Sequence, residues 1–155
     1  MAKLPSLVEE FLKLQRIAVV GVSRDPQQPA NAIFRKLRDA GHQVFALNPQ
    51  TTQVEGVPCY PNLHALPEPV EAVMIVTPPE QAAQVVRECA ELGIRNVWLH
   101  RSFGEGSVSE EAVSECERLD IHCITGGCPM MYCEPVDMGH CCMKWVLMLQ
   151  GRLPQ

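Results

Sequence analysis

The sequence predicts an α/β fold: one domain with a doubly wound, mostly parallel sheet of five strands and a C-terminal helix. Three observations support this prediction. Short apolar runs alternate with helical patterns along most of the 155 residues. The run over residues 72–76 is apolar throughout, which is typical of a strand covered on both faces. Gly41 and Gly93 follow two of the helical patterns, in the position of a C-terminal cap.

The N-terminal part predicts a helix, a strand and a second helix. Ser6 and Glu9 have the spacing of a capping box, which predicts a short helix over residues 7–14, lying over one edge of the sheet. Residues 16–20 form the first strand. Apolar side chains at helical spacing then predict the first crossover helix over residues 30–40.

The second strand is expected over residues 44–47. A connection rich in Pro and Gly follows over residues 48–69. It has room for a short strand over residues 57–60 and a turn of helix near Leu63. The buried third strand over residues 72–76 ends at a Thr-Pro-Pro turn.

The alternation then continues to a fifth strand. An amphipathic pattern predicts a helix over residues 80–92, and residues 96–99 form the fourth strand. A helix over residues 108–119 is acidic in its first turn, as the helix dipole favours, and precedes a strand over residues 121–124. Right-handed crossovers between such strands place ligands at their carboxyl ends, where the winding reverses.

The composition and net charge exclude some classes of binding partner. The formal net charge of −5 argues against nucleic acid and acidic membrane surfaces, because such binding needs a dense Lys/Arg surface. No apolar run is long enough to span a bilayer, and the N-terminus is unlike a secretory signal. We therefore expect a cytoplasmic protein with its eight cysteines mostly reduced.

The first strand-to-helix corner is the leading candidate for a binding site. The strand ends at Gly21, and free N–H groups of Gly21, Val22 and Ser23, together with the helix N-terminus, would favour a phosphate there. Ser23 adds a hydroxyl donor, and Arg24 adds a cation. The glycine could instead serve only the turn.

Three other strand ends should share the same rim of the sheet. Asn48 and Pro49 follow the second strand and suit a ribose or base edge. Thr77 and Pro78 form a rigid, apolar wall for an adenine face or an alkyl-amide arm. The further polar candidates, just beyond the fourth strand, are Arg101 and Ser102.

An NAD(P)-binding oxidoreductase domain is the first alternative. The dinucleotide fingerprint needs two further glycines, which this loop lacks. Asn48 also stands where an acidic residue normally accepts hydrogen bonds from the ribose. Both features favour a different nucleotide cofactor.

The order of several short blocks resembles the stand-alone CoA-binding domain proteins, which have a Rossmann-like fold. These proteins are similar to the N-terminal domain of the succinyl-CoA synthetase alpha chain. The resemblance extends over about residues 8–128, and its blocks are Ala-Val-Val-Gly-Val-Ser, Gly-His-Gln-Val, Asn-Pro, Gly-Val-Pro, Val-Met-Ile-Val-Thr-Pro-Pro and Gly-Ile-Arg-Asn-Val-Trp.

The resemblance implies that coenzyme A or an acyl-CoA binds across the strand ends. Residues 21–24 and the Asn48-Pro49 turn would hold the nucleotide half, and residues 77–79 and 100–102 would line the rest of the groove. The phosphorylated histidine of the synthetase lies in a second domain that this chain lacks, so its ligase chemistry does not transfer. We expect a non-catalytic binding or regulatory module, with a protein partner or a second copy as a further possibility.

Residues 126–155 are a cysteine-rich extension with a helix over residues 139–149, expected to pack on the domain. Its cysteines and His140 contain enough soft ligands for a metal, but no Cys-x2-Cys clamp is present. A metal or thiol redox regulator is therefore the second alternative, and it includes a mixed disulfide between Cys128 and a CoA thiol. We predict no catalytic and no metal-binding residues. Small, buried, unreactive cysteines packed with the neighbouring methionines are the favoured explanation of the pattern.

Overall fold

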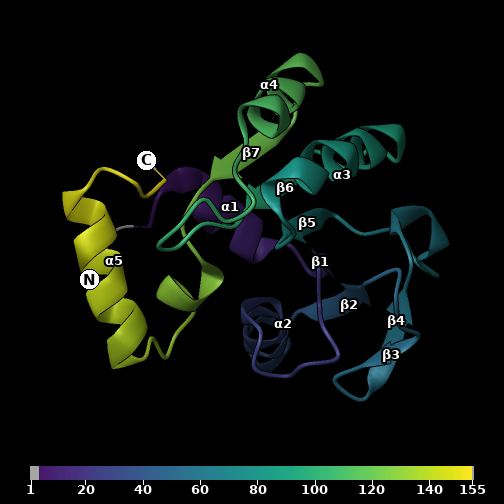
Figure 1. The fold of residues 1–155 in the computed structure, drawn as a ribbon, viewed down its shortest axis with the longest axis horizontal. Helices are drawn as coiled ribbons and strands as arrows, with labels where there is room; N and C mark the ends of the chain where they lie inside the picture. The colour runs from purple at the N-terminus through teal and green to yellow at the C-terminus, as the bar shows by residue number, and fades with distance from the viewer. Residues whose placement is uncertain (1–3, 155) are drawn as a thin grey trace.

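A computed structural model describes residues 4–154 and contains a seven-stranded sheet in the order β3-β4-β2-β1-β5-β6-β7 (Figure 1). The five predicted strands are all present and run parallel to one another. They are β1 (Arg16–Val20), β2 (Gln43–Leu47), β5 (Ala72–Ile75), β6 (Asn96–Leu99) and β7 (His122–Thr125). The α/β class and the mostly parallel sheet are thus confirmed.

The predicted count of five strands is wrong. β4 (Val57–Tyr60) extends the sheet parallel to β2, and β3 (Gln53–Val54) pairs antiparallel with β4 as the edge. The hairpin turns at Glu55 and Gly56, both at positive φ. The short strand expected over residues 57–60 is present as β4, whereas the two residues of β3 give too little apolar alternation to indicate a strand from sequence.

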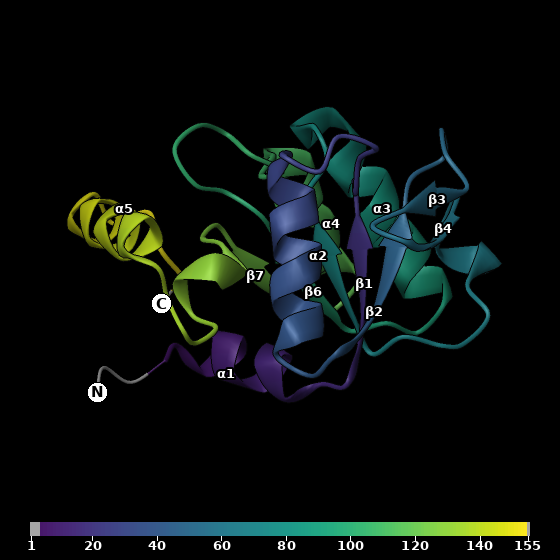
Figure 2. The ribbon, with the colours of Figure 1, turned by 90° about the horizontal axis from the view of Figure 1, so that it is seen from below.

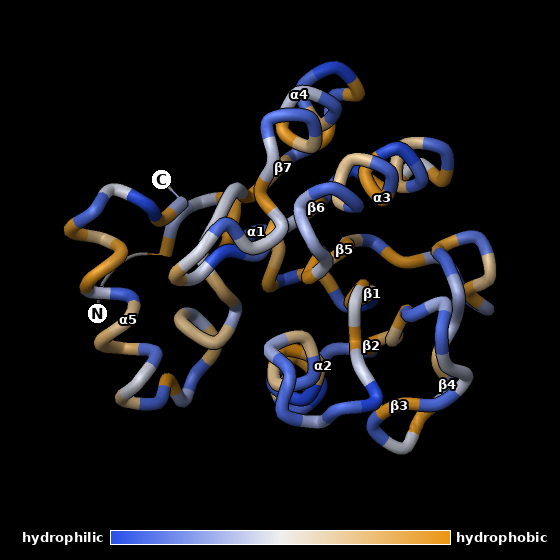
Figure 3. The backbone as a smooth tube through the Cα atoms, in the orientation of Figure 1, coloured by the Kyte–Doolittle hydropathy of each residue, from blue (hydrophilic) through white to orange (hydrophobic). Residues whose placement is uncertain are grey.

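Alternate side chains of each strand point to opposite faces of the sheet, and each face has its own core. Ile17 and Val19 of β1 join the core beneath α1 (Ser6–Lys13) and α2 (Pro29–Asp39). Ala18, between them, joins the core beneath α3 (Pro79–Glu91) and α4 (Glu110–Arg118). Figure 2 shows α2 lying along one face of β1 and β2, and Figure 3 shows apolar residues concentrated in the strands.

The predicted capping box of α1 is not formed. Pro5 is the N-cap, Ser6 is the first helical residue, and no side chain caps the helix. Glu9 instead forms an ion pair with Lys13, at 2.9 Å, one turn further along. The helix forms because its apolar face is buried: Phe11 packs edge-on against Trp98 of β6, with ring centroids 5.4 Å apart.

The C-terminal segment begins as part of this same core. The indole N–H of Trp98 donates to the Gly126 carbonyl oxygen at 2.8 Å, and Tyr132 lies against the Trp98 ring. A 3-10 turn, η2 (Pro129–Met131), leads to α5 (Met138–Leu149) at the edge of the molecule (Figure 1). No helix in the described part of the chain is long and apolar enough to cross a membrane.

Candidate functional site

The winding of the sheet reverses between β1 and β5. From β1 the chain moves to β2 on one side and returns to β5 on the other, so the loops after β1 and β5 diverge at the carboxyl edge. Two hollows lie along this edge, and both are lined by Gly21, Val76, Thr77 and Pro78. They form one groove at the switch point, as the sequence predicts.

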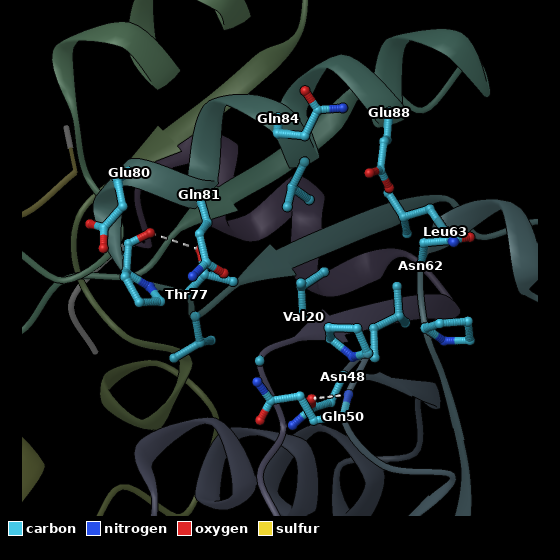
Figure 4. Close-up of a pocket in the computed structure, with 17 residues that line it drawn as sticks. Val20, Asn48, Gln50, Asn62, Leu63, Thr77, Glu80, Gln81, Gln84 and Glu88 are labelled. Atoms are coloured by element: carbon cyan, nitrogen blue, oxygen red, sulfur yellow. Dashed lines mark hydrogen bonds between the residues drawn. The ribbon is translucent and has the colours of Figure 1, made fainter.

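The first hollow encloses about 520 Å³ between β2, α3 and the 3-10 turn η1 (Leu63–Ala65). Figure 4 shows Gln81 of α3 extending into the hollow on the side opposite Asn48 and Gln50, with Asn62 at one end; Gln84 lies further along α3. Its floor is apolar, with Val20 and Leu47 at the strand ends. Amide side chains around an apolar floor suit an uncharged, planar group with hydrogen-bonding edges.

The second hollow encloses about 390 Å³ and runs from the first βα loop to the end of β6. Ser23, Gln28 and Ala30 line one side, and His100 with Ser107 lines the other. The Ser107 hydroxyl donates to the Thr77 carbonyl oxygen at 2.7 Å, which holds the loop after β6 against the loop after β5.

Gly21 is required by packing within the protein. Its φ is +105°, a left-handed conformation, and a Cβ at this position would overlap the carbonyl oxygen of Val76. The glycine therefore lets the end of β1 pass closely beside the residue after β5. This close approach brings the two loops together at the centre of the groove.

Two asparagine side chains hold the loop after β1. Asn31, which is buried in the first turn of α2, accepts a hydrogen bond from Ser23 N through Oδ1 at 2.9 Å and donates to Ser23 O through Nδ2 at 2.7 Å. Asn48 donates through Nδ2 to the Val22 carbonyl oxygen at 2.9 Å. The loop conformation is thus set by the protein itself, before any ligand arrives.

These contacts narrow the set of free backbone donors. Gly21 N–H donates to Leu47 O, and Ser23 N–H donates to Asn31, so neither is available to a phosphate. The amide of Val22 has no partner in the described chain, whereas its side chain is fully buried. The Ser23 hydroxyl accepts from Asp25 N at 3.0 Å and retains its own proton for donation.

Two helix N-termini point at the groove. Gln28, Pro29 and Ala30 at the start of α2 line the second hollow, and Pro78, the N-cap of α3, lines both. Within residues 4–154 the lining contains no lysine or arginine, so these helix ends and the loop supply the positive potential. Glu80 and Glu88 in the first hollow direct an anion toward the α2 side.

The structure gathers most of the predicted site residues into the groove. Val22, which is fully buried, and Arg24, which is exposed, line neither hollow. Ser102 lies beside the groove, with its hydroxyl 3.4 Å from His100 Nε2. The residues that do line it are Gly21, Ser23, Asn48, Pro49, Thr77 and Pro78.

Arg101 is not brought into the groove. Its backbone N–H donates to Gly127 O at 3.0 Å, in an isolated bridge, and its guanidinium reaches the Arg152 carbonyl oxygen at 3.4 Å. Burial and the neighbouring Arg152 charge lower the pKa of Arg101. This arginine thus fastens the C-terminal segment to the end of β6.

His100 is a buried titratable group in the lining. Burial, with a smaller effect from His140, lowers its pKa to about 4, so the imidazole is neutral at pH 7. A neutral imidazole can donate or accept one hydrogen bond without adding charge to this end of the groove.

The cysteines give little support to a metal or redox centre. No group of three or more His, Cys, Asp or Glu residues in the described chain could hold a metal ion. Burial raises the pKa of the Cys128 thiol to about 12, whereas a mixed disulfide with the cofactor would need a lowered pKa. Cys141 and Cys142, by contrast, are exposed on α5.

The fold and groove define a doubly wound α/β protein with a ligand site at the switch point. Residues 15–134 match the family of CoA binding domains. The chain belongs to this family, and its cofactor is coenzyme A, which confirms the resemblance seen in the sequence.

Similar proteins include larger CoA ligases. The chain is 29% identical over 118 residues to the ADP-forming acetate–CoA ligase I of Archaeoglobus fulgidus, covering 72% of this chain and 17% of that enzyme. It is 30% identical over 114 residues to the ADP-forming acetate–CoA ligase II subunit alpha of Pyrococcus furiosus, covering 73% and 25% respectively. The chain therefore spans a quarter or less of either relative's length.

A solved structure shows the same fold in a protein of similar size. A hypothetical protein from Pyrococcus horikoshii superposes with a TM-score of 0.73 at 24% identity, covering 83% of this chain and 92% of the other. The Rossmann-like fold thus occurs outside the large ligases as well.

Proposed function

We propose that this chain is a stand-alone, non-catalytic module that holds coenzyme A or an acyl-CoA along the switch-point groove. The adenosine occupies the first hollow, the diphosphate crosses the loop over residues 21–24, and the pantetheine arm follows the second hollow toward His100. The continuity of the two hollows through Gly21 and Thr77 is the observation that carries this proposal.

Chemical matching supports each part of this assignment. Gln50, Asn62, Gln81 and Gln84 offer the amide donors and acceptors that a purine and ribose need. The Val22 amide, the Ser23 hydroxyl and the α2 N-terminus form the anion-binding part of the groove. The second hollow, with few charges and a neutral His100, suits an uncharged amide-containing arm.

A binding role is favoured over catalysis because the groove holds no activated nucleophile. Burial raises the pKa of Cys128, and the neutral His100 is a weak base. We propose that the protein acts in the cytoplasm by retaining or presenting the cofactor.

Calorimetric titration with CoA tests the site. Ser23→Asp places a carboxylate beside the diphosphate and should weaken binding at least tenfold, or about 1.4 kcal/mol, while changing stability little. Ser114→Asp, on the exposed face of α4, adds the same charge elsewhere and serves as the control. Equal titrations for Ser23→Asp and wild type would contradict the assignment.

The non-catalytic part needs its own test. Acetyl-CoA incubated with the protein and followed by mass spectrometry should remain intact at the rate seen without protein. Release of CoA that disappears in the Ser23→Asp variant would show that the groove supports catalysis.

A titration with NAD in place of CoA tests the alternative cofactor. It should give no saturable heat, since the Asn48 side chain is hydrogen-bonded to Val22 and no carboxylate follows β2.

A further inference from the structure

The α5 helix carries two apolar faces, and only one is covered. On the inner face Leu147 is fully buried, and Lys144 lies 4.5 Å from the centre of the Tyr132 ring. The outer face is exposed, and we call its residues the α5 stripe: Met138, Cys141, Cys142, Trp145, Met148 and Leu149. Figure 1 shows α5 at one end of the molecule, away from α3 and the β3-β4 hairpin.

The α5 stripe is a continuous apolar seam. Its members recur at spacings of three and four residues, the period that packs one helix against another. Met138 is 82% exposed, Trp145 61% and Leu149 78%. Isolated exposed apolar residues are ordinary, but six at this spacing on one helix are typical of an interface.

No charge interrupts the stripe. Lys144 is the only lysine or arginine of α5, and it turns inward, where its Nζ donates to the Met131 carbonyl oxygen at 3.5 Å. An uncharged seam offers no complement to a nucleic acid, an anionic lipid headgroup or a charged peptide. It fits another uncharged apolar helix, and the chain itself supplies one.

The size and symmetry of the surface fit a pair of copies. The exposed parts of the stripe and the adjoining Val146 correspond to roughly 600 Å² of apolar surface, against about 800 Å² per partner in a standard interface. Trp145 lies near the middle of the seam. Because Trp145 is central, a second copy of α5 running antiparallel can place its stripe residues against those of the first at the same spacing. The antiparallel arrangement also brings the N-terminal end of each helix dipole beside the C-terminal end of the other.

We propose that the α5 stripe is a homodimer interface, in which two copies pack α5 against α5 about a two-fold axis near Trp145. α5 lines neither hollow of the groove, so both grooves stay open in the dimer. This inference is independent of the proposed CoA site. A CoA titration on the same samples distinguishes a failure of the dimer proposal from a failure of the CoA-binding proposal.

Sedimentation velocity on the full chain over roughly two decades of concentration tests the proposal. Wild type should sediment as a dimer at the higher concentrations. The double variant Trp145→Glu, Leu149→Glu should be monomeric, with dimerisation weakened at least 100-fold because four carboxylates would be buried in one seam. Leu92→Glu is the matched control: Leu92 is 43% exposed at the end of α3, and this variant should stay dimeric.

Two further measurements test whether the double variant is folded and whether the α5 stripe binds a lipid surface instead of a second copy. The double variant should keep the circular dichroism and CoA titration of wild type, since the inner face of α5 is unchanged. Wild-type protein that stays monomeric throughout, or a double variant that remains dimeric, overturns the proposal. Monomeric wild-type protein that sediments with phosphatidylcholine vesicles also overturns it, in favour of a lipid surface.

Discussion

Asn31 grips the main chain of Ser23 at two points, accepting from its N–H at 2.9 Å and donating to its carbonyl oxygen at 2.7 Å. The Asn31 amide also donates to Glu55 Oε1 at 2.9 Å, and Arg35 pairs with the same carboxylate oxygen at 2.7 Å. The β3-β4 hairpin thus supports the loop after β1 through α2. Such support reduces the conformational entropy that ligand binding must remove.

Removing the Asn31 amide should weaken both the fold and cofactor binding. Asn31→Ala leaves the Ser23 N–H and carbonyl groups without these partners, which should cost about 1–3 kcal/mol in the free energy of unfolding. The loosened loop should raise the Kd for CoA by roughly tenfold. Urea unfolding and calorimetry measure the two effects.

Asn96→Ala is the matched control for Asn31→Ala. Asn96 donates to the Glu71 carbonyl oxygen at 3.2 Å, at the end of the sheet opposite the groove. It should lose stability without changing CoA affinity. If Asn31→Ala binds CoA as tightly as Asn96→Ala does, the loop is not preorganised by Asn31.

A comparison of Gly21 and Gly41 distinguishes two destabilising effects of a side chain at positive φ: backbone strain and steric overlap with neighbouring atoms. Both have φ near +100°, but a Cβ at Gly41 meets nothing, whereas a Cβ at Gly21 overlaps Val76 O. Gly41→Ala should therefore cost about 1 kcal/mol of conformational strain. Gly21→Ala should cost at least ~2 kcal/mol more, since backbone must move. Similar unfolding midpoints for the two variants would refute this packing role.

His100 should make stability depend on pH in a defined window. Its pKa falls from 6.5 to about 4 in the folded protein because it is buried. As pH drops from 6.5 to 4, the unfolded chain binds a proton here and the folded chain does not. Folding stability should therefore decrease over this range, by about 3 kcal/mol in total.

Replacing the imidazole by a neutral amide tests this assignment. His100→Gln should flatten the curve of unfolding free energy against pH between 6.5 and 4. His122→Gln, at an exposed position on β7, should leave the curve as in wild type. A His100→Gln curve that parallels wild type across this window would rule out the buried neutral imidazole.

The strands could be predicted from sequence because burial on both faces leaves a local mark. Residues of β5 are apolar at every position and fully buried. β4 was expected over residues 57–60, but the two-residue β3 left no such mark, because it depends on antiparallel pairing with β4. The capping box failed because Ser6 is the first helical residue and Pro5 takes the N-cap position, a boundary that local spacing alone does not decide.

The site residues at the ends of strands could be predicted from sequence, and the others could not. Gly21 and Thr77 follow strands, so topology alone brings them together. The role of Asn31 was not predicted, because its hydrogen-bond partners lie in the loop after β1 and in the β3-β4 hairpin, outside its own helix. The available signal was a polar amide on the buried face of α2, three residues before Phe34. Arg101 follows a strand too, but the C-terminal segment draws its side chain away.

A crystal structure of the protein with CoA tests the central claim most directly. We predict diphosphate oxygens within hydrogen-bonding distance of the Val22 amide and the Ser23 hydroxyl, with adenine between Asn48 and Gln84. Cofactor bound away from the β1–β5 switch point, or a groove left empty at saturating CoA, would contradict the account.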